Sequence, residues 1–212
     1  MSHSAKHLRR ACFIAFAVVA LAGGTIAMPA FTSAANPADD KGNAKALVAE
    51  DPKQLGELLF AAIQTNDESK AAALIPPQDV AEKAIASLPF TDEETKRKQS
   101  ALLEKHFADL KPKFGAVLKS TAEFAKTNEI DWKNARVVEV EAKTRVGREG
   151  VEQFSKMKVR IALDKESDVS VTIEMDDGRK LGDAWYFTDA PLAIEVVRDG
   201  KTVRQDLRKP AK

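Results

Sequence analysis

The sequence predicts an α+β fold in which N-terminal helices pack on a curved antiparallel sheet formed by the C-terminal half. Two observations carry this prediction. Up to about residue 128, apolar residues recur at spacings of three and four, as on the buried face of a helix. From about residue 138 the spacing changes to two, which is typical of strands with one buried and one wet face. Helices first and strands second favour the α+β class.

The helical half contains four expected helices. Asp51 and Pro52 are typical of a helix start, and the first apolar stripe runs to about residue 63. Asp67 is expected to cap a short second helix, and a third is expected over about residues 78–87. The spacing of Thr91 and Glu94 predicts a capping box that begins a long helix.

The long helix is expected to continue to about residue 128. Its apolar positions would be Leu102, Leu103, Phe107 and Leu110, and Pro112 would break or kink it. Beyond Pro112 the apolar stripe resumes, which favours a second helical stretch on the same face.

The strand half shows three alternating segments. Their apolar positions start at Val138, Met157 and Val169, and the residues between them are mostly charged or polar. Asp177 and Gly178 are expected to turn the chain into a strand over residues 184–188. The last hairpin is expected to turn at residues 199–200, and residues 145–150 are expected to be a hairpin connection.

The first 35 residues predict an export signal. Met1–Arg10 carries three basic residues, Ala11–Ala22 is apolar, and small residues follow up to a cleavage pattern at Ser33–Ala35 or, earlier, at residues 25–27. We therefore expect a periplasmic or extracellular protein. An uncleaved membrane anchor over residues 11–30 is the alternative, and membrane contact is expected only in that case.

The remaining chain divides into a polar linker at residues 36–50, a single α+β domain at 51–207 and a basic tail at 208–212. The chain has 33 basic and 32 acidic residues, and removing the leader with its three basic residues leaves 30 and 32. A formal charge of −2 over 177 residues lacks the basic field that nucleic-acid binding requires, so no nucleic-acid partner is expected.

Cysteine and histidine are nearly absent after the leader. Cys12 is the only cysteine, and His106 is the only histidine beyond residue 35. This inventory excludes a disulfide framework, a thiol nucleophile and a Cys/His zinc site in residues 36–212, so we expect no metal and no cofactor.

The order of elements resembles a known superfamily. Leu58–Asp67 and the step Ala72–Pro76 resemble the opening of cystatin-like cone domains of the nuclear transport factor 2-like superfamily. Glu129–Trp132 and the strand Asp183–Asp189 resemble small exported bacterial proteins of unknown function with this fold. The resemblance covers about residues 52–191 and implies a cone of helices on a curved sheet. It contains no motif diagnostic of an activity, and function does not follow from a fold.

Three groups of residues are candidates for chemistry. His106 could act as a general base with Asp109, which lies three residues further along the helix, although a His at the edge of the core is the commoner case. Asp176, Asp177, Asp183 and Asp189 could gather at one sheet edge, although a hairpin turn is the commoner meaning of Asp-Gly.

Aromatic residues are the third group. Trp132, Trp185 and Tyr186 could line a ligand site, although a core Trp is the commoner case. Trp185 and Tyr186 are adjacent, so on a strand they would face opposite sides.

The sequence therefore favours an exported, non-enzymatic domain that binds a small molecule or a partner protein. One alternative is a hydrolase or isomerase of the same fold that uses His106 and an acid such as Asp109. Another is an envelope-tethered structural or interaction module. A homodimer is compatible with the sequence, although no feature of the sequence specifies one.

Overall fold

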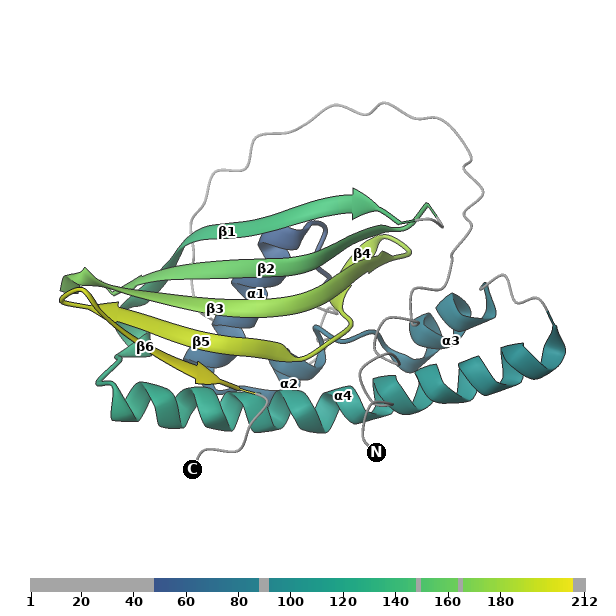
Figure 1. The fold of residues 1–212 in the computed structure, drawn as a ribbon, viewed down its shortest axis with the longest axis horizontal. Coiled ribbons are helices and arrows are strands. Elements are labelled where there is room, and N and C mark those ends of the chain that lie inside the picture. The colour runs from purple at the N-terminus through teal and green to yellow at the C-terminus, as the bar shows by residue number, and fades with distance from the viewer. Residues whose placement is uncertain (1–47, 88–91, 148–149, 164–165, 208–212) are drawn as a thin grey trace, which may run out of the picture.

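The computed structural model describes residues 48–87, 92–147, 150–163 and 166–207 and has the predicted α+β fold (Figure 1). The expected leader and basic tail lie outside these residues, as does most of the linker. Within the described ranges, none of the helices combines the length and apolar character that crossing a membrane requires. The helices come first and the strands follow: α1 Pro52–Thr65, α2 Glu68–Ala72, α3 Gln78–Ala86, α4 Glu93–Thr127 and the short 3₁₀ helix η2 Trp132–Asn134.

One antiparallel sheet contains all six strands: β1 Ala135–Val146, β2 Glu152–Leu163, β3 Glu166–Leu181, β4 Ala184–Phe187, β5 Pro191–Arg198 and β6 Lys201–Asp206. The order along the sheet is β1-β2-β3-β5-β6. Strand β3 is long enough to pair with β5 along its first part and with β4 along its last part. Strands β4 and β5 therefore both pair with the same edge of β3, and the short β4 lies at the C-terminal end of that edge.

Local capping explains the first two helices, as predicted. The Asp51 side chain accepts a hydrogen bond from the Gln54 backbone N–H at 2.7 Å, and Pro52 occupies the first helical position. Asn66 ends α1 in the left-handed conformation with a φ of 49°. The Asp67 side chain then accepts from two backbone N–H groups of α2.

Helix α4 differs from its prediction at three points. Its N-cap is Asp92, which accepts from the Thr95 backbone N–H, rather than Thr91, which lies outside the described residues. The helix continues through Pro112 as one element of 35 residues, so of the two effects expected of Pro112 the break is wrong, whereas the bend of α4 near its middle in Figure 1 agrees with a kink. Leu102 is 62% exposed and does not belong to the core.

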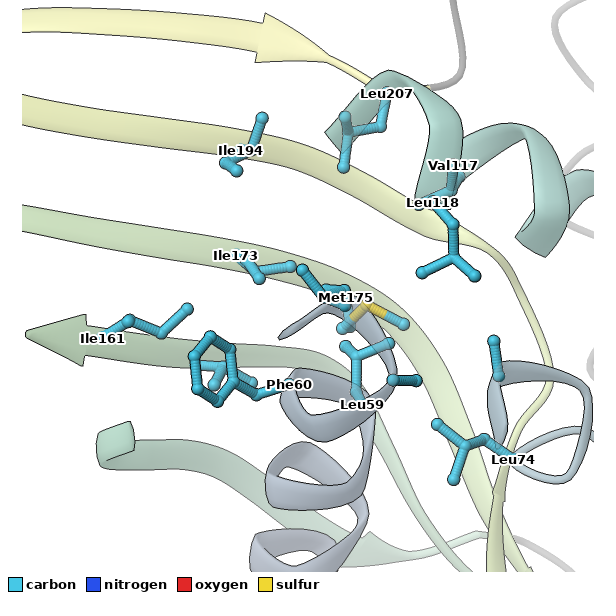
Figure 2. Packing of buried hydrophobic residues seen from close by; sticks show 14 of the residues in the cluster. Leu59, Phe60, Leu74, Val117, Leu118, Ile161, Ile173, Met175, Ile194 and Leu207 are labelled. Atoms are coloured by element: carbon cyan, nitrogen blue, oxygen red, sulfur yellow. The ribbon is translucent and has the colours of Figure 1, made fainter. Parts of the chain in front are cut away.

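The core lies between the sheet and helices α1, α2 and α4. Figure 2 shows side chains from α1 and α4, from Leu74 just after α2, and from β2, β3 and β5 directed toward one another. Met157 and Ile173 on the strands and Leu55 and Leu110 on the helices are all completely buried. Helix α1 lies close to the sheet because Gly56 has no side chain: a Cβ there would lie 2.9 Å from a methyl group of Val140.

Helix α3 packs on the opposite side of the β3–β4 hairpin. Its Val80 and Ala84 contact a small cluster formed by Leu181, Ala184 and Tyr186. The expectation that all helices cover one face therefore holds for α1, α2 and α4 but not for α3.

Two strand predictions are wrong. A bulge at Val138 shifts the register of β1 against β2, so Val137 takes the inward position and Val138 is 51% exposed. Asp177 and Gly178 are not a turn, because β3 continues through them. The turn into β4 lies at Gly182 and Asp183, where Gly182 has a φ of 65°, as a two-residue hairpin with Gly first requires.

The other hairpins agree with the sequence. Asp199 and Gly200, with φ values of 51° and 72°, turn β5 into β6. Residues 147 and 150–151 belong to the connection between β1 and β2, while Arg148 and Glu149 lie outside the described residues.

Candidate functional site

We call the sheet face opposite α1 the outer face; Figure 1 looks onto it, and α1, α2 and α4 do not cover it. A row of ion pairs crosses this face. Arg160 on β2 contacts Glu139 and Glu141 on β1 at 2.9 and 3.1 Å. Arg204 on β6 contacts Glu195 on β5 at 3.4 Å. The register explains the row, because Glu139, Arg160, Thr172, Glu195 and Arg204 stand opposite one another on successive strands.

Glu174 on β3 is the central residue of this network. Its side chain is only 7% exposed, and it accepts a hydrogen bond from the Arg204 guanidinium. Lys156 and Lys158 of β2 each place Nζ 3.7 Å from the same carboxylate. The hydrogen bond from Arg204, with the charges of Arg204 and the two lysines, lowers the pKa of Glu174 against the opposing effect of burial. The carboxylate is therefore a fixed negative centre surrounded by cations.

We expect Glu174→Gln to lower the free energy of unfolding by about 1–2 kcal/mol at pH 7, because it leaves three partly exposed cations without their shared anion. A lowered pKa means that this stability is present above the ordinary value of 4.5 and is lost as the pH falls through the folded-state value. Urea unfolding at pH 7 and pH 3 measures both effects. Glu195→Gln, on the same arginine but more exposed, is the control and should cost less than about 0.5 kcal/mol. Equal losses for the two variants would contradict the central role of Glu174.

His106 lies at the contact between α4 and the end of β4. Its Nε2 is 2.8 Å from the Thr188 carbonyl oxygen, so this nitrogen carries the proton and donates it. The ring also has an edge contact with Phe107. Within the described ranges, no hydrogen bond or ion pair joins His106 to Asp109, which is exposed. The structure therefore fixes the imidazole to a backbone carbonyl, and the pairing of His106 with Asp109 stays a prediction.

The four candidate acids are not gathered at one point. Asp183 lies in the β3–β4 turn, and Asp176 is paired in register with Lys156 on β2. Burial of the Asp177 carboxyl raises its pKa, and the charge of the nearby Asp189 raises it further. The charges of Arg179 and Arg145 oppose this rise.

We expect Asp177→Asn to raise the melting temperature at neutral pH, because it removes a half-buried carboxylate whose ionisation costs stability. For an acid with a raised pKa this cost appears as the pH rises from 3.8 through the folded-state value, so the gain should vanish near pH 3. Calorimetry across this range is the measurement. Asp183→Asn, at an exposed turn position, is the control and should show no such pH-dependent gain. A destabilised Asp177→Asn variant at pH 7 would show that the two arginines outweigh burial.

The three candidate aromatics all take part in packing. Trp185 is 2% exposed and stacks on Phe154 with 5.8 Å between ring centroids. Tyr186 faces the other side of β4, as predicted, and is buried against α3, which raises the pKa of its hydroxyl. Trp132 packs edge-on against Phe60 at 6.0 Å. No ligand-lining role follows from these contacts.

The ion-pair network was not singled out from the sequence, although its signal is present there. The wet positions of the predicted strands are acidic at 139 and 141, basic at 158 and 160, and acidic at 174. This alternation of sign between neighbouring strands predicts cross-strand pairs only once the register is known.

Among the residues that the structure describes, no group of three or more His, Cys, Asp or Glu side chains is placed to hold a metal ion. No family model, curated protein or solved structure matches the chain.

Proposed function

We propose that this chain is an exported, non-enzymatic domain that binds a partner protein through the outer face of its sheet. One observation carries the proposal: α1, α2 and α4 fill the inner face, while on the opposite face α3 covers only the β3–β4 hairpin and the described strands carry charged side chains in a fixed network (Figure 1). Side chains already held by ion pairs lose little conformational freedom on binding, which favours a specific interface.

The filled inner face favours a partner protein over a small ligand. A cone domain that holds a ligand needs space between the sheet and its helices. Here Leu59, Phe114 and Met175 meet in that space, each at most 2% exposed (Figure 2 shows Leu59 and Met175). Export rests on the leader sequence, and membership of the nuclear transport factor 2-like superfamily stays a prediction.

Site-specific photo-crosslinking in the native host tests the binding surface. Ser170 is exposed at the outer face of the central strand β3 and takes no part in the network, so a photoreactive residue there leaves the ion pairs intact. Lys119, exposed on α4, is the matched control position. We expect one defined partner band from position 170 alone, weakened by the additional change Arg160→Glu. Equal labelling from both positions, or none from position 170, would reject the outer face.

Native mass spectrometry of the protein from its host's envelope fraction tests export. A mass that corresponds to residues 36–212 is expected, whereas retention of residues 1–35 would favour the tethered module. A bound small molecule in the same spectrum would favour the ligand-binding alternative. Substrate turnover that His106→Ala abolishes would favour the enzymatic alternative.

A further inference from the structure

We infer that a second copy of this chain pairs with the outer edge of β1 in an antiparallel manner, with Ala142 facing its own counterpart. The inference does not rest on the proposed function. Strand β1 is the first strand in the order of the sheet, so one of its edges has no neighbouring strand among the residues that the structure describes. None of the described helices runs along that edge in Figure 1. An uncovered strand edge presents unpaired backbone groups that template pairing with another chain.

The charges of β1 are self-complementary about Ala142. In a two-fold antiparallel pair centred there, Glu141 faces Lys143 of the second copy and Glu139 faces Arg145. Each contact occurs twice, which makes four pairs of opposite charge on the outer face. Opposite charges placed directly across two strands stabilise a sheet, and like charges destabilise it.

The neighbouring positions also match in this register. Val140 would face Thr144 on the inner face, and Val146 would come next to the bulged Val138 of the second copy at each end of the pair. These two valines, 51% and 66% exposed, are among the few large apolar side chains that the described part of the molecule leaves in solvent. Pairing would therefore cover apolar surface that the single chain exposes.

Other registers are worse. A centre on Glu141 or Lys143 places that residue against itself, and a centre on Thr144 places Lys143 against Arg145. A centre between two residues would put inward positions opposite outward ones, because side chains alternate along a strand. The pairing of β1 with β2 shifts register twice, at Val138 and between Ala142 and Thr144. At the second shift β1 advances by two residues while β2 advances by three, so the extra residue belongs to β2 and β1 keeps its alternation over residues 139–145.

The opposite edge of the sheet does not offer the same match. Strand β6 has only six residues, and its best centre, Gln205, would place Arg204 against Asp206 as its one kind of charge pair, whereas β1 offers two kinds. The self-complementary pattern thus singles out β1, and pairing there would join the two outer faces into one continuous surface.

A charge-exchange experiment tests the pairing by sedimentation velocity on the full chain. We expect the wild type to form a dimer. Lys143→Glu places Glu against Glu141, and Glu141→Lys places Lys against Lys143, so each variant alone should dissociate with a dissociation constant at least about tenfold higher. Mixing the two variants restores opposite charges at both contacts and should restore a heterodimer. Thermal unfolding of each variant checks that the fold survives, since Glu141 also contacts Arg160.

Cysteine crosslinking tests the register. In a Cys12→Ser background, Ala142→Cys should oxidise to a disulfide-linked dimer, since residues directly opposed in an antiparallel pair have Cα atoms about 4.5–5.5 Å apart. Thr144→Cys is the control, because its counterpart would lie four residues away along the strand, at about 13 Å. A wild-type chain that stays monomeric up to about 1 mM, a dimer unaffected by Lys143→Glu, or equal crosslinking at both positions would overturn the inference.

Discussion

Replacing Phe114 by Ala is expected to lower the free energy of unfolding by about 3–5 kcal/mol, a large part of the stability of a domain of this size. The ring is 2% exposed, and its centroid lies 6.0 Å from that of Phe187 on β4. It therefore fastens α4 to the sheet at the point where the helix enters the core. The loss has two parts: the favourable free energy of moving the ring from water into the core, and the cost of the cavity that the surrounding side chains cannot fill.

Urea unfolding measures this loss, and Leu102→Ala on the same helix is its control. Leu102 is 62% exposed, so its removal should change the free energy of unfolding by less than about 0.5 kcal/mol. Similar losses for the two variants would show that the N-terminal half of α4 is held in the fold by contacts that the structure does not contain.

The contrast between these two residues shows where helical periodicity stops being informative. Spacings of three and four correctly predict a helix and the face that carries Leu110 and Phe114. They do not predict how far along the helix that face remains covered. Along α4, the residues from Glu93 to Asp109 include none that is buried. Which part of a helix is covered depends on the elements that pack against it, and this is a tertiary property.

Strand periodicity is informative in the same limited way. The alternation in β2 and β3 correctly identifies Met157, Val159, Val171 and Ile173 as inward residues. It is wrong for Val138, because one extra residue in a bulge reverses the phase and leaves no mark in the composition.

The outer-face network was out of reach of the sequence for a related reason. The charged residues at positions 139, 141, 158, 160 and 174 stand at wet positions that alternation predicts, but their pairing, and that of the strands on which alternation was not read, needs the register of five strands at once. Glu174 shows the consequence, because nothing in its local sequence distinguishes a buried anion from an ordinary exposed one.

The second large effect is expected for Gly178→Ala, with a loss of about 3 kcal/mol in the free energy of unfolding. A Cβ at this position would lie 2.2 Å from Cζ of Phe154, far inside van der Waals contact. The ring has little freedom to move aside, since it stacks on Trp185 and meets Phe187 edge-on at 6.2 Å. Gly178 is thus required by close packing within a strand and not by a turn.

The matched control is Gly182→Ala, at the position that does turn. A φ of 65° and open space around the missing side chain predict only the strain of a left-handed alanine, about 1 kcal/mol. If Asp177 and Gly178 formed the turn that the sequence favours, the order of the two losses would be reversed. Urea unfolding of the pair therefore distinguishes the local sequence signal from the observed hairpin.

A double-mutant cycle then tests the cause of the Gly178 effect. Phe154→Leu alone should destabilise the fold, because it removes a ring that is 1% exposed. If the collision with the ring is the cause, the loss from Gly178→Ala should shrink by at least about 1 kcal/mol in the Phe154→Leu background. Additive losses would instead assign the effect to the strand backbone, where β3 passes from its pairing with β5 to its pairing with β4. The coupling energy thus decides whether an aromatic ring or the backbone geometry requires glycine at this position.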